Sequence, residues 1–171
     1  MLKLILNKKY NPLFSSEARY FIITGGRGSG KSYAVTVFLT LLTMAKGIRI
    51  LFTRFTMTSA HLSIIPEFLE KIGLLGFDEV FSINKAEVLN QSNNSDILFR
   101  GIRTSAGNQT ASLKSLQGIS TWVLDEAEEL VDENIFDTID LSIREKDIQN
   151  RIILILNPVT KEHWIYKRFF E

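Results

Sequence analysis

The sequence predicts an α/β domain of three layers, in which helices cover both faces of a mainly parallel sheet that carries an appended antiparallel hairpin. Short apolar runs alternate with helix-like segments along the chain, which is the pattern of strand–helix–strand units. The run Arg151–Leu156 is almost continuously apolar, as expected of a strand covered on both faces. Two strand-like runs, Ala86–Leu89 and Asp96–Phe99, flank the turn-rich segment 90–95 and predict the hairpin.

Length and composition indicate one ordinary globular domain. The chain has 171 residues, of which 45% are hydrophobic and 23% charged. The net charge of +1 is far from the strongly basic character of dedicated nucleic-acid binders, so DNA contact by this chain alone should be weak. Without cysteine there is no disulfide framework or thiolate metal site. The apolar stretch Tyr33–Ala45 is too short to span a bilayer, so we expect no membrane association.

The first half of the chain contains the first predicted strands and helices. A strand at Tyr20–Thr24 is followed by a helix that should run to about Lys46, with Gly47 as its stop. A second strand is expected at Ile48–Thr53. Its end and the following Arg54 would lie at the carboxyl edge of the sheet, where ligands collect in such folds.

The remaining helices are predicted from shorter signals. We expect a helix over Ala60–Ile72, with Pro66 marking its start or a kink. The polar segment Gly101–Gly118 has no sustained period and predicts a loop with a short helix near Ser112–Leu116. An amphipathic helix should begin at His163–Phe170, and its aromatic side chains are assigned to packing rather than to DNA stacking.

Eight residues directly behind the first strand have the spacing of a phosphate-binding P-loop. They are Gly25, Gly26, Arg27, Gly28, Ser29, Gly30, Lys31 and Ser32. The glycines let backbone N–H groups turn toward phosphates, and the helix start adds its positive dipole end. Lys31 would reach the β- and γ-phosphates of ATP, and the Ser32 hydroxyl would hold Mg²⁺. The alternative, a plain glycine-rich turn, does not explain the Lys-Ser ending or the apolar strand and helix on either side.

The apolar run Trp122–Asp125 ends in two adjacent carboxylates, which is the form of a Walker B segment. Asp125 would support the Mg²⁺ shell, and Glu126 would orient and deprotonate the attacking water. The alternative is a helix start, since acidic residues favour the first turn of a helix. Beside a P-loop we favour the acid pair. Its second acid indicates a P-loop NTPase of the additional-strand, catalytic-glutamate class, which hydrolyses its nucleotide.

Asn157 follows the strand Arg151–Leu156 and could sense the γ-phosphate from the carboxyl edge of the sheet. The alternative is that Asn157-Pro158 merely ends the strand in a turn. Its position after a third core strand favours the sensor. The segment Asn84–Glu87 imitates part of a guanine-reading motif, but it precedes the acidic strand and ends in Glu, so we interpret it as a chance match.

Taken together, these motifs resemble the ATPase domain of the large terminase subunit of tailed bacteriophages, and the resemblance spans nearly the whole chain. The order and spacing of several elements carry it. They are Arg19-Tyr20, the P-loop, Phe99-Arg100-Gly101, Leu113-Lys114-Ser115, Val123–Ala127, Leu156-Asn157-Pro158, Trp164 and Lys167-Arg168-Phe169.

The resemblance implies ATP-driven translocation of double-stranded DNA into a procapsid by a homo-oligomeric ring docked on the portal, with a small terminase subunit as partner and the host cytoplasm as location. It implies that Asn157 lies in the motif that couples hydrolysis to movement, and that Arg27 matches the family's P-loop arginine. Lys114 is nearest the position of a basic residue that acts on a neighbour's ATP, with Arg100 and Arg103 as competitors. The family's nuclease domain has no counterpart here, so we expect residues 1–171 to be an isolated ATPase domain.

Two other functions share these motifs. The chain could be another P-loop DNA motor, such as a helicase or a chromosome-partition ATPase. It could also be a nucleotide-gated binding module that changes shape without turnover, although Glu126 argues against this. The adenine pocket is left open by the motifs, and Tyr10–Tyr20 is placed there only by its proximity to the P-loop strand.

Overall fold

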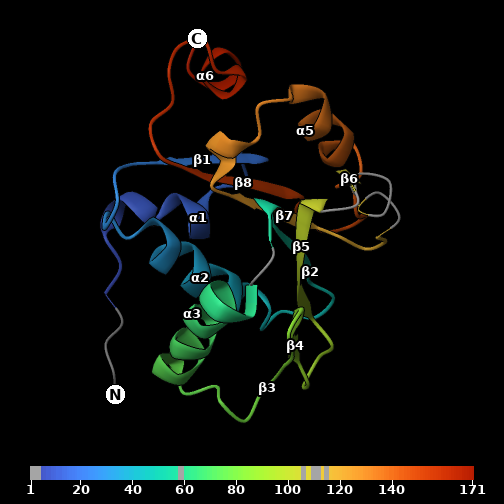
Figure 1. Cartoon of the computed structure of the whole chain (residues 1–171). Coiled ribbons are helices and arrows are strands. Elements are labelled where there is room, and N and C mark those ends of the chain that lie inside the picture. Colours follow the sequence, from blue (N-terminus) through green and yellow to red (C-terminus); the bar gives the residue numbers. More distant parts are fainter. Residues whose placement is uncertain (1–4, 58–59, 105–106, 109–112, 114–115) are drawn as a thin grey trace.

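The computed structural model describes residues 5–57, 60–104, 107–108, 113 and 116–171. It has three layers, with a sheet between helices α1, α2 and α3 on one side and α5 and α6 on the other (Figure 1). The helical segments are η1 Lys8–Tyr10, α1 Pro12–Ser15, α2 Lys31–Leu42, α3 Ala60–Leu75, η2 Ala127–Glu129, α5 Glu133–Asp140 and α6 Trp164–Phe169. No helix in the described part of the chain is both long and apolar enough to span a bilayer.

The sheet is mainly parallel, which confirms the predicted fold class. In spatial order it contains β1 Tyr20–Thr24, β8 Arg151–Leu156, β7 Thr121–Asp125, β2 Arg49–Thr56, β5 Asp96–Thr104, β4 Glu87–Asn90 and β3 Phe81–Ile83, with β6 Gly107–Asn108 beside β5. The strands β1, β8, β7, β2 and β5 are parallel to their neighbours along this path, whereas β4 pairs antiparallel with both β5 and β3. Strand β5 therefore belongs to the hairpin and to the parallel core at once.

Two hydrophobic cores lie on the two faces of the sheet. Successive side chains of a strand point to opposite faces, so Val123 of β7 joins the core under α2 and α3, while Trp122 and Leu124 join the core under α5 and α6. All three are fully buried. The sheet is thus covered on both faces, as the apolar run of β8 predicts.

Helix α2 ends at Leu42, four residues earlier than expected, and the hairpin turn bonds the carbonyl groups that directly follow it. The side-chain amides of Asn90 and Asn93 each donate to the Thr43 carbonyl at 3.0 Å, and Asn93 also reaches the Met44 carbonyl at 3.0 Å. These bonds satisfy carbonyls that helix ends leave unpaired. Gly47 then reverses the chain with a left-handed φ of 80°.

The expected loop at Gly101–Gly118 is wrong at its start, because β5 continues through Thr104 and pairs there with β6. The other differences from the sequence expectations concern helices. Pro66 lies inside α3 rather than at its start, where burial of Ile65 and Phe68 holds the helix against the sheet. Helix α5 is an element that the sequence analysis does not predict. The expected short helix near Ser112–Leu116 falls mostly outside the described residues. The aromatic helix α6 packs as predicted, with the Trp164 ring 4.8 Å from the Phe136 ring.

The aromatic core under α3 yields a stability prediction. Phe68 is fully buried and its ring lies 5.4 Å from Phe99 and 5.9 Å from Phe52. We expect Phe68→Ala to lower the free energy of unfolding by about 3–5 kcal/mol through lost burial and the cavity left behind. The neighbouring Leu69 is 48% exposed, so Leu69→Ala should change the free energy of unfolding by less than about 1 kcal/mol. Chemical denaturation of both variants checks this, and equal losses would contradict the packing described.

Candidate nucleotide-binding site

The predicted P-loop connects the carboxyl end of β1 to the start of α2. Gly28 and Gly30 have left-handed φ angles of 73° and 82°, which side chains other than glycine adopt at a cost. A cleft of about 390 Å³ opens above this loop. It is lined by Arg27, Gly28, Ser29, Gly30, Lys31, Ser32, Tyr33, Arg54, Asp125, Glu126, Glu128, Ile155, Leu156 and Asn157. Residues predicted from three separate motifs therefore meet in one place.

Lys31, the first residue of α2, folds back over the P-loop. Its ammonium group donates to the carbonyl oxygens of Gly25 and Gly26, the latter at 3.0 Å. These two glycines do not line the cleft directly, but they hold the lysine at its edge. An incoming anion would offer this ammonium a charged acceptor in place of two neutral carbonyls, which is the stronger hydrogen bond.

The N-terminal segment supports the P-loop from outside. The Tyr10 hydroxyl donates to the Ser29 carbonyl at 2.9 Å, and the Lys9 ammonium donates to the same oxygen at 3.3 Å. Tyr10 is only 6% exposed, so its ring is packed in the core beneath α2. This support was missed because the segment carries no motif. In this structure Tyr10 therefore supports the P-loop, through its packed ring and its bond to Ser29.

The acid pair lies at the tip of β7, where Asp125 is the last residue of the strand. Asp125 is buried, whereas the Glu126 side chain is 45% exposed. Glu126 adopts a left-handed φ of 53°, uncommon for a residue with a side chain, and begins the short η2 turn. Because Glu126 follows the strand with this backbone, both carboxylates line the same cleft, one buried and one partly exposed.

Arg54 is a functional candidate that the sequence analysis left without a role. Strands β2 and β7 pair with Thr53 beside Leu124, which places Arg54 beside Asp125. Its Nε and Nη2 atoms lie 2.8 and 2.7 Å from Asp125 Oδ2, and Nε lies 3.7 Å from Glu126 Oε2. Only the order of the strands brings these residues together, so no local sequence signal could have identified the contact.

The environment of Glu126 raises the pKa of its carboxyl group. Burial is the main cause, the Arg54 guanidinium lowers the pKa in part, and the nearby Asp125 carboxylate raises it further. A carboxylate with a raised pKa is a stronger base. This direction agrees with the role predicted for Glu126.

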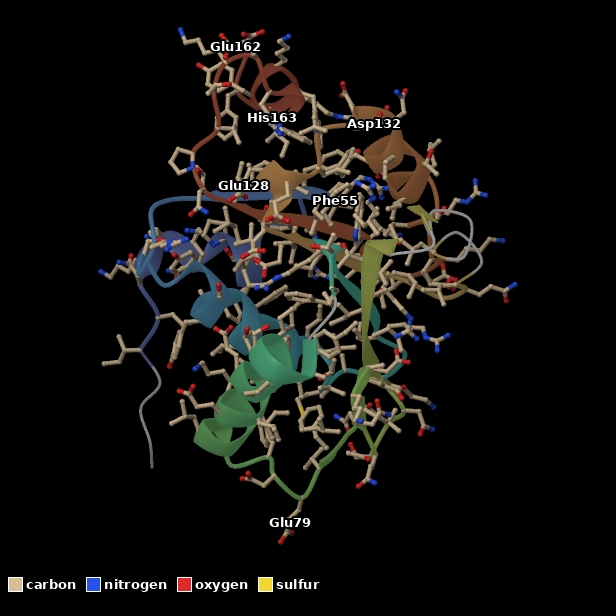
Figure 2. The ribbon with its side chains drawn as sticks, viewed as in Figure 1. Phe55, Glu79, Glu128, Asp132, Glu162 and His163 are labelled. Atoms are coloured by element: carbon tan, nitrogen blue, oxygen red, sulfur yellow. The ribbon has the colours of Figure 1, made fainter. Side chains whose placement is uncertain are left out.

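Asn157 meets an acid that the sequence analysis did not single out. Its side-chain amide donates to Glu128 Oε1 at 2.7 Å, and the other oxygen, Oε2, is buried without a hydrogen-bond partner. Figure 2 labels Glu128, which lies between the strand ends and His163. Three acids, not two, therefore line the cleft.

The candidates for a trans-acting basic residue are less well defined. Lys114 lies outside the described residues. The Arg100 guanidinium donates to the backbone carbonyl of Phe99 at 2.8 Å, and Arg103 is exposed. Neither arginine lines the cleft of its own chain.

The cleft fits a magnesium ion bound together with phosphates. Among the described residues, no group of three or more His, Cys, Asp or Glu side chains could hold a metal by itself. Mg²⁺ at phosphate sites uses only one or two protein ligands and takes the rest from phosphate and water. Ser32 and Asp125 both line the cleft and supply a hydroxyl and a carboxylate.

Comparison with known proteins gives consistent results. A family model described as phage terminase large subunit matches residues 17–171. The PBSX phage terminase large subunit of Bacillus subtilis (strain 168) is 29% identical over 171 aligned positions. The match covers 95% of this chain and 38% of that protein. The chain therefore spans well under half the length of this curated relative.

Solved structures show the same fold. The large terminase of a thermophilic bacteriophage superposes with a TM-score of 0.75 at 10% identity, covering 98% of this chain and 43% of that one. It has also been solved with ADP and with ATP-gamma-S. The large terminase ATPase domain of Thermus phage P74-26 superposes with a TM-score of 0.68 at 17% identity, covering 97% of this chain and 70% of that one. The Phi-29 viral genome packaging motor assembly superposes with a TM-score of 0.66 at 17% identity, covering 98% of this chain and 51% of that one. By the family match over residues 17–171, this chain belongs to the phage terminase large subunit family.

Proposed function

We propose that residues 1–171 form the ATPase domain of a phage DNA-packaging motor, which binds ATP·Mg²⁺ and hydrolyses it. The observation that carries this proposal is the single cleft shared by the P-loop, the acid pair and Asn157. The complexes of the thermophilic phage's large terminase with ADP and ATP-gamma-S support a nucleotide as the ligand.

Each group in the cleft has a distinct task. Backbone N–H groups of the P-loop, Lys31 and Arg27 bind the phosphates, and Ser32 and Asp125 hold Mg²⁺. When bound, the metal neutralises charge that develops on the phosphate oxygens. Glu126 accepts the proton of the attacking water, and the Asn157 amide contacts the terminal phosphate.

The wider function is translocation of double-stranded viral DNA into a procapsid. Family membership and the likeness to the Phi-29 viral genome packaging motor assembly support it. We infer a homo-oligomeric ring on the portal, a small terminase subunit as partner and action in the host cytoplasm. Lys114 is our candidate for the residue that acts on a neighbour's ATP. The low net charge of +1 is consistent with DNA binding that needs several subunits.

A helicase or partition ATPase is the rival function, and substrates separate the two. Turnover stimulated by portal and procapsid would support packaging, whereas strand separation by the isolated chain would support a helicase. The binding module without turnover is tested by the variants below.

The first prediction concerns Glu126. We expect Glu126→Gln to lower the rate of phosphate release by about 10²–10⁴-fold, because a general base is worth that much, while nucleotide affinity changes little. Glu129→Gln is the matched control, since Glu129 lies on the same turn and is exposed. Rates and affinities are measured by phosphate release and calorimetry. Unchanged phosphate release in Glu126→Gln would favour the binding module instead.

The second prediction concerns Arg54. Its removal leaves the buried Asp125 and its neighbour Glu126 without a counter-charge, and hydrogen bonds to charged groups contribute about 1.5–3 kcal/mol. Arg54→Ala should lower the stability of the nucleotide-free chain by about that amount. Because a cation can replace the guanidinium, the loss should shrink when Mg²⁺ is added. Thermal unfolding with and without Mg²⁺ tests this, and Arg103→Ala, at an exposed position, should lack both effects.

The third prediction concerns assembly. A trans-acting basic residue is worth about 10³–10⁵-fold in rate, and an isolated chain lacks a neighbour to supply it. Turnover per chain should therefore be slow in dilute solution and rise with protein concentration as rings form. Steady-state rates alongside light scattering measure this, and fast turnover by a dilute monomer would rule it out.

A further inference from the structure

A continuous series of hydrogen bonds runs from the nucleotide cleft to helix α6. The Asn157 amide donates to the Glu128 side chain at 2.7 Å, and the Glu128 backbone carbonyl lies 3.1 Å from His163 Nε2. His163 Nδ1 accepts from the Ile165 N–H at 3.2 Å and caps the start of α6. Because Nδ1 accepts a hydrogen bond, the proton of the neutral ring is on Nε2, which donates to Glu128. Figure 2 shows His163 above Glu128 at the same end of the sheet.

The carboxylate of Glu128 has few hydrogen-bond partners in the cleft. One carboxylate oxygen has a single neutral amide as partner, and the other is buried without any. A carboxylate oxygen that is buried without a partner is costly, so a small change in its surroundings can shift the position of the side chain. It also lines the cleft that would receive a polyanion.

Helix α6 is attached to the same segment by a further bond. The Trp164 indole donates to the Leu130 carbonyl at 2.5 Å, just after the η2 turn. Arg168 donates to Asp137 at 2.6 Å, which ties α6 to α5 instead. The bonds of His163 and Trp164 are therefore the ones that would transmit a displacement of the η2 turn to α6.

We propose that Glu128 is a positioning residue that makes α6 respond to the terminal phosphate of the bound nucleotide. The proposal rests on the proposed function of the cleft. A terminal phosphate accepts the hydrogen bond of the Asn157 amide in place of Glu128. Both carboxylate oxygens of Glu128 are then unpaired and face the like charge of the phosphate. The η2 turn then moves away from the cleft, and His163 and α6 move with it. A diphosphate lacks this terminal phosphate, so Asn157 keeps its bond to Glu128 and the arrangement stays intact.

The test uses the two tryptophan indole N–H signals in nitrogen-15 NMR spectra of the whole chain. Trp164 reports on α6, whereas Trp122 is fully buried in β7 and reports whether the sheet core is intact. The probes are the Mg²⁺ complexes of ADP and of the nonhydrolysable β,γ-imido analogue of ATP. We expect the analogue, but not ADP, to shift the Trp164 signal.

Two variants separate coupling from binding. Glu128→Gln keeps an acceptor for Asn157 but removes the repelling charge, so it should lose the Trp164 shift and bind the analogue about tenfold more tightly. His163→Ala should lose the shift with unchanged affinity, because it acts after Glu128. Glu129→Gln, one residue away and exposed, should behave as the unaltered chain in both measurements.

The outcomes are distinct. An analogue-specific Trp164 shift that is lost in Glu128→Gln and His163→Ala but kept in Glu129→Gln supports the proposal. Equal shifts with ADP and the analogue, or a full shift in Glu128→Gln with its Trp122 signal in place, overturn it while leaving the proposed function untouched. Failure of the unaltered chain to bind either nucleotide by calorimetry would overturn both.

Discussion

The parallel alignment of β1, β8, β7 and β2 is the constraint on which the candidate site depends. Parallel strands present their carboxyl ends at one edge of the sheet, so residues far apart in the sequence become neighbours there. The P-loop leaves β1, Asn157 leaves β8, Asp125 ends β7, and Arg54 lies near the end of β2. A one-residue slip in any of these pairings would turn that strand's side chains to the other face and separate the groups.

Electrostatic balance within the chain keeps this crowded edge stable without a ligand. Arg54 compensates the acids at the tip of β7, and Lys31 is held by backbone carbonyls. Nucleotide and metal would therefore exchange partners with Arg54 and Lys31, which are already paired, and would meet one acid, Glu128, with an unpaired oxygen. Such exchange limits the free energy of binding, yet it lets occupation of the cleft release specific side chains, Arg54 and Glu128 among them.

The sequence predicts what is local and misses what depends on strand order. The P-loop, the acids and Asn157 could be placed because each motif sits at the end of its own apolar strand, and the strand bounds agree within a few residues. Arg54 was placed at the correct edge, but its contact with Asp125 requires knowing that β2 lies beside β7. Glu128 was missed because Glu128-Glu129, separated from the acid pair by Ala127, resembles an exposed turn, and nothing local shows that Asn157 faces one of these acids. The amides that bond the carbonyl directly after α2 likewise lie almost fifty residues away.

The two walls of the cleft belong to different layers of the molecule. The P-loop wall continues into α2, whose Val35 and Leu39 are fully buried in one core, whereas the wall of acids continues into η2, whose Ala127 is fully buried in the other (Figure 1). Close packing makes each layer resist deformation and transmit strain as a unit. We therefore expect movement where the walls meet the sheet, at the short segments that follow β1, β7 and β8. Glu126, with its left-handed backbone, lies in one of them, and Asn157 lies in another. The proposed motor function would use this division, because two rigid layers joined at a few residues would turn a local exchange of hydrogen bonds into relative motion of whole helices.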